Sequence, residues 1–159
     1  MAEYSANALQ TLTDASPALP FTESPVPCTK GYIFHRDGTP TFNLASPSRI
    51  NGKVWSGCCC NRHMAQAQYE VAFHANIAVS EGGTIGPISL AIAIDGNVDP
   101  SSQMTVTPAA AEEFFNVGTE IGVSVPAICG CESVSIVKTS TGPVDVQNAN
   151  IVINLKQIV

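Results

Sequence analysis

The chain has 159 residues, of which 45% are hydrophobic and only 13% charged, with a net charge of −6 at neutral pH. This length is enough for one domain with a hydrophobic core. The seven Lys and Arg residues form no basic run, which argues against binding of nucleic acid through its phosphates. No apolar window of about 18 residues could span a membrane. A chain with so little charge is expected to cover apolar surface by forming oligomers.

Residues 1–27 are predicted to form an extended arm outside the domain. The segment lacks the basic and apolar regions of a signal peptide, so we expect synthesis in a cytoplasm. Four prolines lie between positions 17 and 27, and each removes a backbone donor. A disordered terminus is one interpretation, and an arm bound to a partner is the other. The apolar residues that would anchor such an arm are Tyr4, Leu9, Leu12, Leu19 and Phe21.

A hairpin is predicted directly after this segment. Residues 32–35 and 41–44 are strand candidates, and Asp37-Gly38-Thr39-Pro40 between them has turn chemistry. His35, Arg36 and Asp37 at this turn are interpreted as a local ion pair rather than an acid–base group.

Residues 69–79 have the clearest periodicity in the chain. Apolar side chains recur at every second position, as in a strand with one buried face. Residues 88–95 alternate in the same way, and a Gly-rich connection joins the two segments. They are therefore predicted to form an antiparallel pair. The small outward residues of both segments are predicted to make a subunit contact: Ala72, His74, Asn76, Ala91 and Ala93.

Further short strands are predicted at residues 104–107, 120–126, 133–138 and 144–153, whereas 108–115 could be a helix or a loop. The last strand changes parity near Asn148, which predicts a bulge. About eight strands separated by turns are typical of an all-β antiparallel sandwich or jelly roll, placed here over residues 28–159. The candidates for its core and for trimer contacts are Phe73, His74, Ile77, Ile92, Val123 and Ile153.

The cysteines are the only residues that suggest a metal. Cys58, Cys59 and Cys60 with His63, together with Cys129 and Cys131, supply the atoms that zinc prefers. Three adjacent cysteines do not match a known zinc motif, and cytoplasmic thiols stay reduced, so free thiols are favoured over zinc or disulfides. No phosphate-binding loop, catalytic triad or paired-carboxylate motif is present. Neither enzymatic activity nor a cofactor is expected.

Several segments resemble a known family of phage proteins. GYIFHRDGTPTFNLAS, YEVAFHANIAVSEGGTIGPISLAIAIDGN, MTVTPAAAEEFFNV and SVSIVKTSTGPVDVQNANIVI, in this order, look like small virion-associated proteins of phages that infect gut Firmicutes. The resemblance covers residues 28–154. The element VQNANIVI is similar to the last strands of trimeric jelly rolls of the tumour-necrosis-factor or C1q type. The resemblance implies a homotrimeric jelly roll displayed on a phage particle.

The function expected from this resemblance is structural. The protein would be a capsid decoration (cement) or head-fibre protein on the virion surface, with itself and the major capsid protein as partners, and would stabilise the shell by binding it. One alternative is a receptor- or glycan-binding tip of a phage fibre, although no fibrous stem is present. Another is a cytokine-like domain, for which a secretion signal would be expected.

Overall fold

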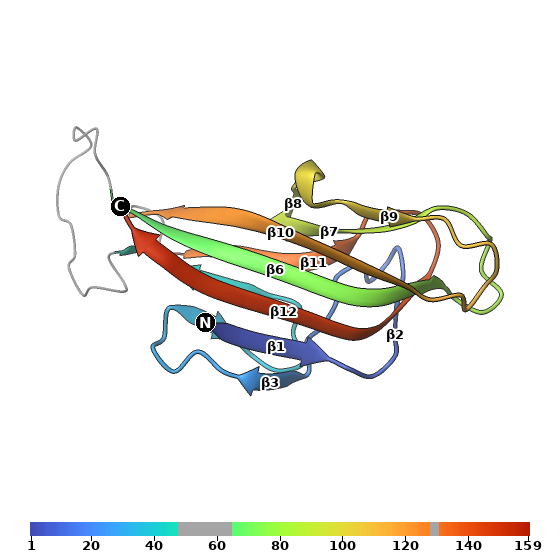
Figure 1. Cartoon of the computed structure of the whole chain (residues 1–159), viewed down its shortest axis with the longest axis horizontal. Helices are drawn as coiled ribbons and strands as arrows, with labels where there is room; N and C mark the ends of the chain where they lie inside the picture. The colour runs from blue at the N-terminus through green and yellow to red at the C-terminus, as the bar shows by residue number, and fades with distance from the viewer. Residues whose placement is uncertain (48–64, 128–130) are drawn as a thin grey trace.

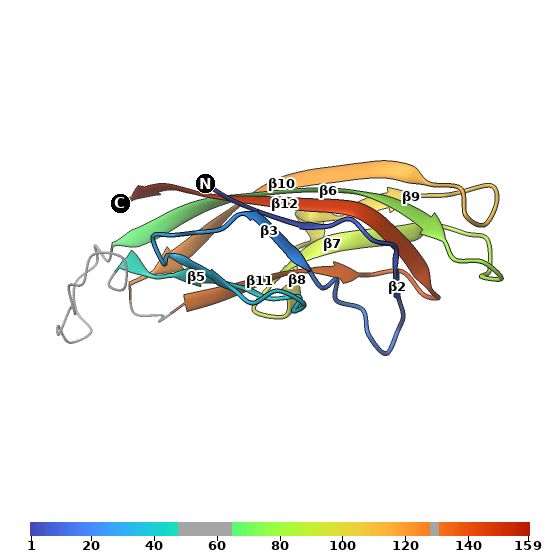
Figure 2. The same ribbon diagram turned by 90° about the horizontal axis from the view of Figure 1, so that it is seen from below.

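The computed structural model describes residues 1–47, 65–127 and 131–159, and within them the fold is a sandwich of two antiparallel sheets. The sheets face each other in Figure 2. Sheet A has the order β10-β6-β12-β1-β3, with β2 beside β12, and sheet B has the order β4-β5-β11-β7-β8, with β9 beside β7. One short 3₁₀ helix, η1 (Pro100–Ser102), lies between β8 and β9. No helix in the described ranges is long and apolar enough to cross a membrane.

Sheet A consists of β1 (Ala2–Ala6), β2 (Gln10–Leu12), β3 (Glu23–Val26), β6 (Gln66–Val79), β10 (Phe115–Pro126) and β12 (Val144–Ile158). Sheet B consists of β4 (Ile33–His35), β5 (Phe42–Ala45), β7 (Ile88–Ile94), β8 (Asn97–Val98), β9 (Met104–Val106) and β11 (Cys131–Lys138). Figure 1 shows sheet A toward the viewer, with the long strands β10, β6 and β12 side by side.

The alternation in β6 positions the core. Tyr69, Val71, Phe73, Ala75 and Ile77 are buried, and the residues between them lie on the outer face of sheet A. Side chains of a strand point alternately to opposite faces, so this pattern buries one face against sheet B. The Tyr69 hydroxyl, inside the core, donates a hydrogen bond to the carbonyl oxygen of Ala45 at 2.8 Å. The predicted strand is therefore present, and the structure extends it to Gln66.

The pairing predicted for residues 69–79 and 88–95 is wrong. β6 pairs with β10 and β12, whereas β7 pairs with β11, β8 and β9 in the opposite sheet. The connection over residues 80–87 crosses from one sheet to the other, so the apolar faces of the two strands oppose each other. The predicted contact surface is consequently divided. Ala72 and His74 lie on sheet A, whereas Ala91 and Ala93 lie in sheet B and are buried.

The N-terminal segment is part of the sandwich, which corrects the prediction of a separate arm over residues 1–27. β1 pairs with β12 from Ala2↔Ile153 to Ala6↔Ala149 and also pairs with β3. The predicted anchors Tyr4, Leu12, Leu19 and Phe21 are at most 3% exposed and belong to the core, and only Leu9 is exposed. The prolines are tolerated because Pro25 lies in an edge strand, whereas Pro17 and Pro20 lie in connections between strands.

Aromatic rings join this segment to the β4–β5 hairpin. The ring of Phe21 lies 5.1 Å from that of Phe42, and the buried imidazole of His35 stacks on Phe42 at 4.2 Å. The His35 ring nitrogens lie 3.0 Å and 3.3 Å from the carbonyl oxygens of Thr41 and Phe21. His35 Nε2 lies 4.0 Å from the Asp37 carboxylate, as expected for a local contact at the turn.

The local predictions of turns and bulges agree with the structure. β4 and β5 form the predicted hairpin. Gly38 in its turn has a φ of 84°, at which the backbone of a residue with a side chain would be strained. In β12 the register shifts between Gln147 and Asn150, and Asn148 has a φ of 51°. This is the predicted change of parity near Asn148. Residues 107–114 form turns rather than a helix, and the Glu113 carboxylate accepts a hydrogen bond from the Ala109 backbone at 2.8 Å.

Candidate functional site

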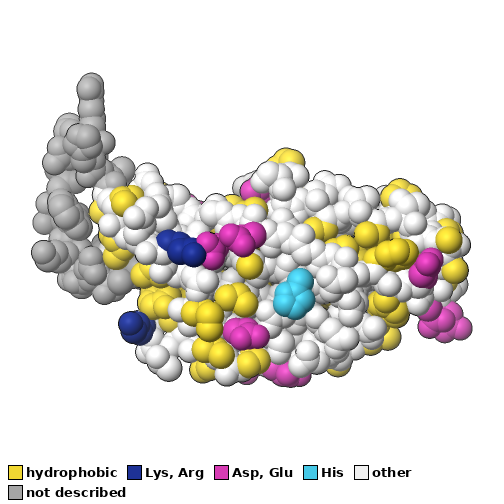
Figure 3. Space-filling model, in the orientation of Figure 1, with side chains coloured by type: hydrophobic (Ala, Val, Ile, Leu, Met, Phe, Trp, Pro, Cys, Tyr) yellow, Lys and Arg dark blue, Asp and Glu magenta, His cyan; other side chains and the backbone are white. Residues whose placement is uncertain are grey.

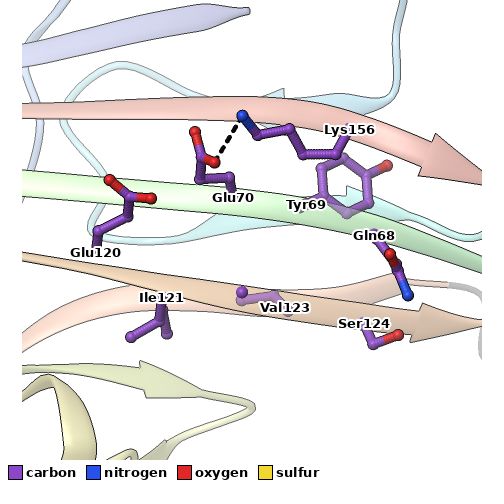
Figure 4. A pocket seen from close by; sticks show the side chains of 9 residues that line it. Gln68, Tyr69, Glu70, Glu120, Ile121, Val123, Ser124 and Lys156 are labelled. Carbon is purple, nitrogen blue, oxygen red and sulfur yellow. Dashed lines mark ion pairs between the residues drawn. The ribbon is translucent and has the colours of Figure 1, made fainter.

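A shallow depression of about 370 Å³ lies on the outer face of sheet A. Three strands contribute its side chains, as Figure 4 shows. The lining residues on the outer face are Gln68 and Glu70 from β6, Glu120, Gly122 and Ser124 from β10, and Lys156 from β12; Tyr69, Ile121 and Val123 complete the lining.

Strand register brings these residues together. Gly122 lies opposite Glu70, and Ser124 lies opposite Gln68, so their side chains share the outer face. Gly122 has no side chain, and a Cβ built there would meet only the carbonyl oxygen of Tyr69, at 4.0 Å. The floor of the depression is therefore backbone, and polar side chains surround it.

An ion pair fixes one side of the depression. Lys156 Nζ lies 2.6 Å from Glu70 Oε2, and Asn154 donates a hydrogen bond to the other carboxylate oxygen at 3.5 Å. The hydrogen bond from Lys156 is the main cause that lowers the pKa of Glu70, and it outweighs the opposing effect of desolvation. β12 changes register between Leu155 and Gln157, so Lys156 is the extra residue of a bulge.

Further cross-strand hydrogen bonds order the polar side chains. Gln157 donates to the Gln68 side-chain oxygen at 2.6 Å, and the Ser124 hydroxyl donates to Gln66 at 2.8 Å. Within the described ranges the Glu120 side chain has no hydrogen bond or ion pair, so its carboxylate is available to a ligand.

The rest of this face is polar but almost uncharged. Asn116 donates a hydrogen bond to the Asn76 side chain at 3.1 Å, and Asn150 donates to Glu3 at 2.7 Å. His74 lies exposed between them. Figure 3 shows this face with only a few Lys, Arg, Asp and Glu side chains on it.

Such an arrangement favours binding over catalysis. It presents a carboxylate, an ammonium group, amides and a hydroxyl within one depression, so it can both donate and accept hydrogen bonds. Glu70 is already paired with Lys156, and no nucleophile in the described part of the site is paired with a base.

The residues predicted from the sequence lie elsewhere. Phe73, Ile77, Ile92, Val123 and Ile153 are buried in the core, and only Val123 borders the depression. The site residues predicted from the sequence do not include Gln68, Glu70, Glu120 or Lys156, although the first three occupy outward positions of alternating segments. The alternation gives the face of each residue but not which strand lies beside which, so it could not bring them together.

The cysteine predictions fall mostly outside the described residues. Cys58, Cys59, Cys60, His63 and Cys129 lie in the ranges 48–64 and 128–130, which the structure does not describe. Among the cysteines it does describe, Cys131 is exposed and Cys28 half-buried. The described part of the chain holds no group of three or more His, Cys, Asp or Glu side chains suited to a metal ion. Free thiols at Cys58, Cys59, Cys60 and Cys129 stay a prediction.

Comparison with known proteins gives similarity to solved structures alone. Neither a protein-family model nor a curated protein matches the chain. The C-terminal domain of EclA, a sugar-binding protein, is 11% identical with a TM-score of 0.40, covering 92% of this chain and 79% of that one. A family 35 carbohydrate-binding module from Paenibacillus barcinonensis is 16% identical with a TM-score of 0.35, covering 97% and 98%. Another, from Clostridium thermocellum, is 12% identical with a TM-score of 0.37, covering 95% and 98%. At these values the likeness assigns the chain to no family.

Proposed function

We propose that the protein is a recognition module that binds carbohydrate in the depression on sheet A. The observation that supports this function best is the ring of hydrogen-bonding side chains around the bare backbone at Gly122. Each sugar hydroxyl both donates and accepts, so it needs a surface that offers both kinds of partner. A site whose polar groups pair with hydroxyls also rejects ligands that lack them, because its own groups would then stay unpaired.

Each side chain has a distinct role in this proposal. Lys156, held by Glu70, donates to a hydroxyl, and the free Glu120 carboxylate accepts from one. Ser124 can do both. The missing side chain at Gly122 lets a sugar ring lie close to the backbone of β10.

The test is calorimetric titration of the protein with neutral oligosaccharides chosen from a glycan-array screen. Gly122→Leu fills the floor and should abolish binding, whereas Glu120→Ala should weaken it about tenfold, the loss expected for a hydrogen bond to a charged group. Asn116→Ala is the matched control, because it lies on the same strand and the same face but outside the depression. The proposal fails if the array shows no ligand, or if Gly122→Leu binds as tightly as the wild type.

A second candidate is the structural role suggested by the phage resemblance, as a trimeric capsid decoration or head-fibre protein. It is favoured by the broad, nearly uncharged outer face around Ala72, His74 and Gly118, since such a surface can pack against another protein without burying charge. Attachment would then use this face or the loops, because residues 1–27 belong to the fold. Co-sedimentation with phage capsids checks this candidate, and protein left in the supernatant would exclude it.

A further inference from the structure

The edges of the two sheets are protected very differently. β3, one edge of sheet A, has four residues, contains Pro25 and shifts register against β1. The strands β4, β8 and β9 at the borders of sheet B have two or three residues each. Short strands, prolines and irregular register are the usual ways in which proteins prevent edge-to-edge pairing.

β10 has none of these protections along most of its length. It runs for 12 residues at the other edge of sheet A and pairs with β6 without any shift, from Phe115↔Ile77 to Pro126↔Gln66. Its only proline is the terminal Pro126, and its only charged side chain is Glu120. Figure 1 shows the strand along the border of the sheet. The backbone hydrogen bonds of β10 within the described ranges all join it to β6.

The free backbone groups of this edge can be assigned to particular residues. A Cβ at Gly118 would lie 3.2 Å from the carbonyl oxygen of Phe73, so this carbonyl points toward β10. Phe73 lies opposite Thr119, which makes these two residues a hydrogen-bonded pair. Antiparallel ladders alternate, so Gly118, Glu120 and Gly122 direct their N–H and C=O groups away from β6. These groups are ready to pair with another strand.

We propose that β10 pairs with β10 of a second copy of this chain, antiparallel, about a two-fold axis at Ile121. This register places Glu120 opposite Gly122 of the second copy, and Gly118 opposite Ser124. The pairs joined by hydrogen bonds are then those whose backbone N–H and C=O groups point away from β6. An axis at Glu120 would instead set two carboxylates directly opposite each other, which is destabilising.

The side chains on the inner side of the strand are also complementary in this register. Val117 meets Val125, and Ile121 meets its own copy across the axis. Ile121 and Val117 are the most exposed of the buried side chains of β10, at 9% and 7%, so pairing covers apolar surface that the single chain leaves open. A second copy is therefore a better occupant than an unrelated peptide, because it supplies a strand of equal length with matching residues.

Pairing at this edge would also bring two carbohydrate-binding depressions together, because Glu120, Gly122 and Ser124 lie on β10. Two sites on one rigid assembly increase the avidity for a repeating ligand without any new contact. The pairing does not depend on carbohydrate binding, and the mass of the assembly is measured without a glycan, so either proposal can fail alone.

The experiment is light scattering coupled to gel filtration on the full chain, with circular dichroism to establish that each variant is folded. The wild type should have the mass of two 16.6 kDa chains. Gly122→Glu sets a carboxylate opposite Glu120 of the other copy on each side of the two-fold axis and should raise the dimer dissociation constant about tenfold or more. Gly122→Lys has a side chain of similar size and should keep the dimer, because it meets Glu120 of the second copy. The double variant Glu120→Lys/Gly122→Glu should restore the dimer.

Several results would overturn the proposal. A wild type with the mass of one chain excludes pairing, and a mass of three chains supports the trimer predicted from the sequence instead, because a two-fold contact closes at two copies. Loss of the dimer in both single variants would show that bulk rather than charge decides, which contradicts the register through Ile121.

Discussion

Replacing Phe21 by Ala tests whether the N-terminal segment belongs to the core. The Phe21 side chain is fully buried, and its ring lies 5.1 Å from Phe42 and 6.4 Å from Phe73. It thus fills space between the two sheets, against β5 of one and β6 of the other. Truncating a fully buried Phe to Ala costs about 3–5 kcal/mol, since burial is lost and a cavity is left.

For a domain of this size, each kcal/mol of lost stability lowers the melting temperature by about 2–4 °C. The Phe21→Ala variant should therefore melt about 6–20 °C below the wild type in a calorimetric or circular-dichroism scan. Leu9→Ala is the matched control, because Leu9 lies in the same segment but is 56% exposed, and its effect should stay within about 0.5 kcal/mol.

Equal, small shifts for the two variants would refute the placement of residues 1–27 in the sandwich and would restore the separate arm. Deleting residues 1–26 gives the same test on a larger scale. It removes β1, β2 and β3 together with the large buried side chains of Tyr4, Leu12, Leu19 and Phe21, and the truncated chain should fail to fold.

The remaining predictions concern acid stability. The hydrogen bond from Lys156 lowers the pKa of Glu70, so the pair stabilises the fold above the usual carboxyl range, and this contribution is lost as pH falls through the lowered pKa. Urea unfolding from about pH 6 down to about pH 2 should show the wild type and Lys156→Met converging in acid, and a constant difference would contradict this. The same sign applies to Asp14, whose pKa is lowered chiefly by a hydrogen bond from the buried Lys138. Asp14→Asn should flatten the acid limb of the stability profile, and an unchanged limb would show that the pair contributes nothing.

Features that depend on neighbouring residues could be predicted from the sequence. The period of two in residues 69–79, the turn at Gly38 and the parity change near Asn148 all follow from local chain geometry, and the structure contains each of them. The pairing of strands could not be predicted in this way. The connection over residues 80–87 is compatible with a hairpin and with a crossing between sheets, and the choice depends on contacts with β10, β11 and β12.

The prediction of a separate N-terminal arm is wrong for a different reason. Prolines exclude an interior strand, but they are compatible with an edge strand such as β3 and with connections between strands. The spaced apolar residues that suggested an anchor for a partner, such as Tyr4 and Phe21, pack against the chain's own hairpin. The depression could not be predicted from the sequence either, because Gln68 and Ser124 are far apart in the chain and meet only through the pairing of β6 with β10.

The position of β12 has a consequence for how quickly the protein can fold. β12 lies between β6 and β1 in sheet A. Its pairs with β1 join residues near the two ends of the described chain, such as Ala2 and Ile153. Contacts of such long sequence separation slow folding, because a large loop must close before they form. At about 5–20 residues per second, a ribosome needs roughly 7–30 s to proceed from β1 to β12. Until β12 has been synthesised, β1 and β6 lack the strand that joins them, so sheet A can be completed only after that point, although β6 can pair with β10 earlier.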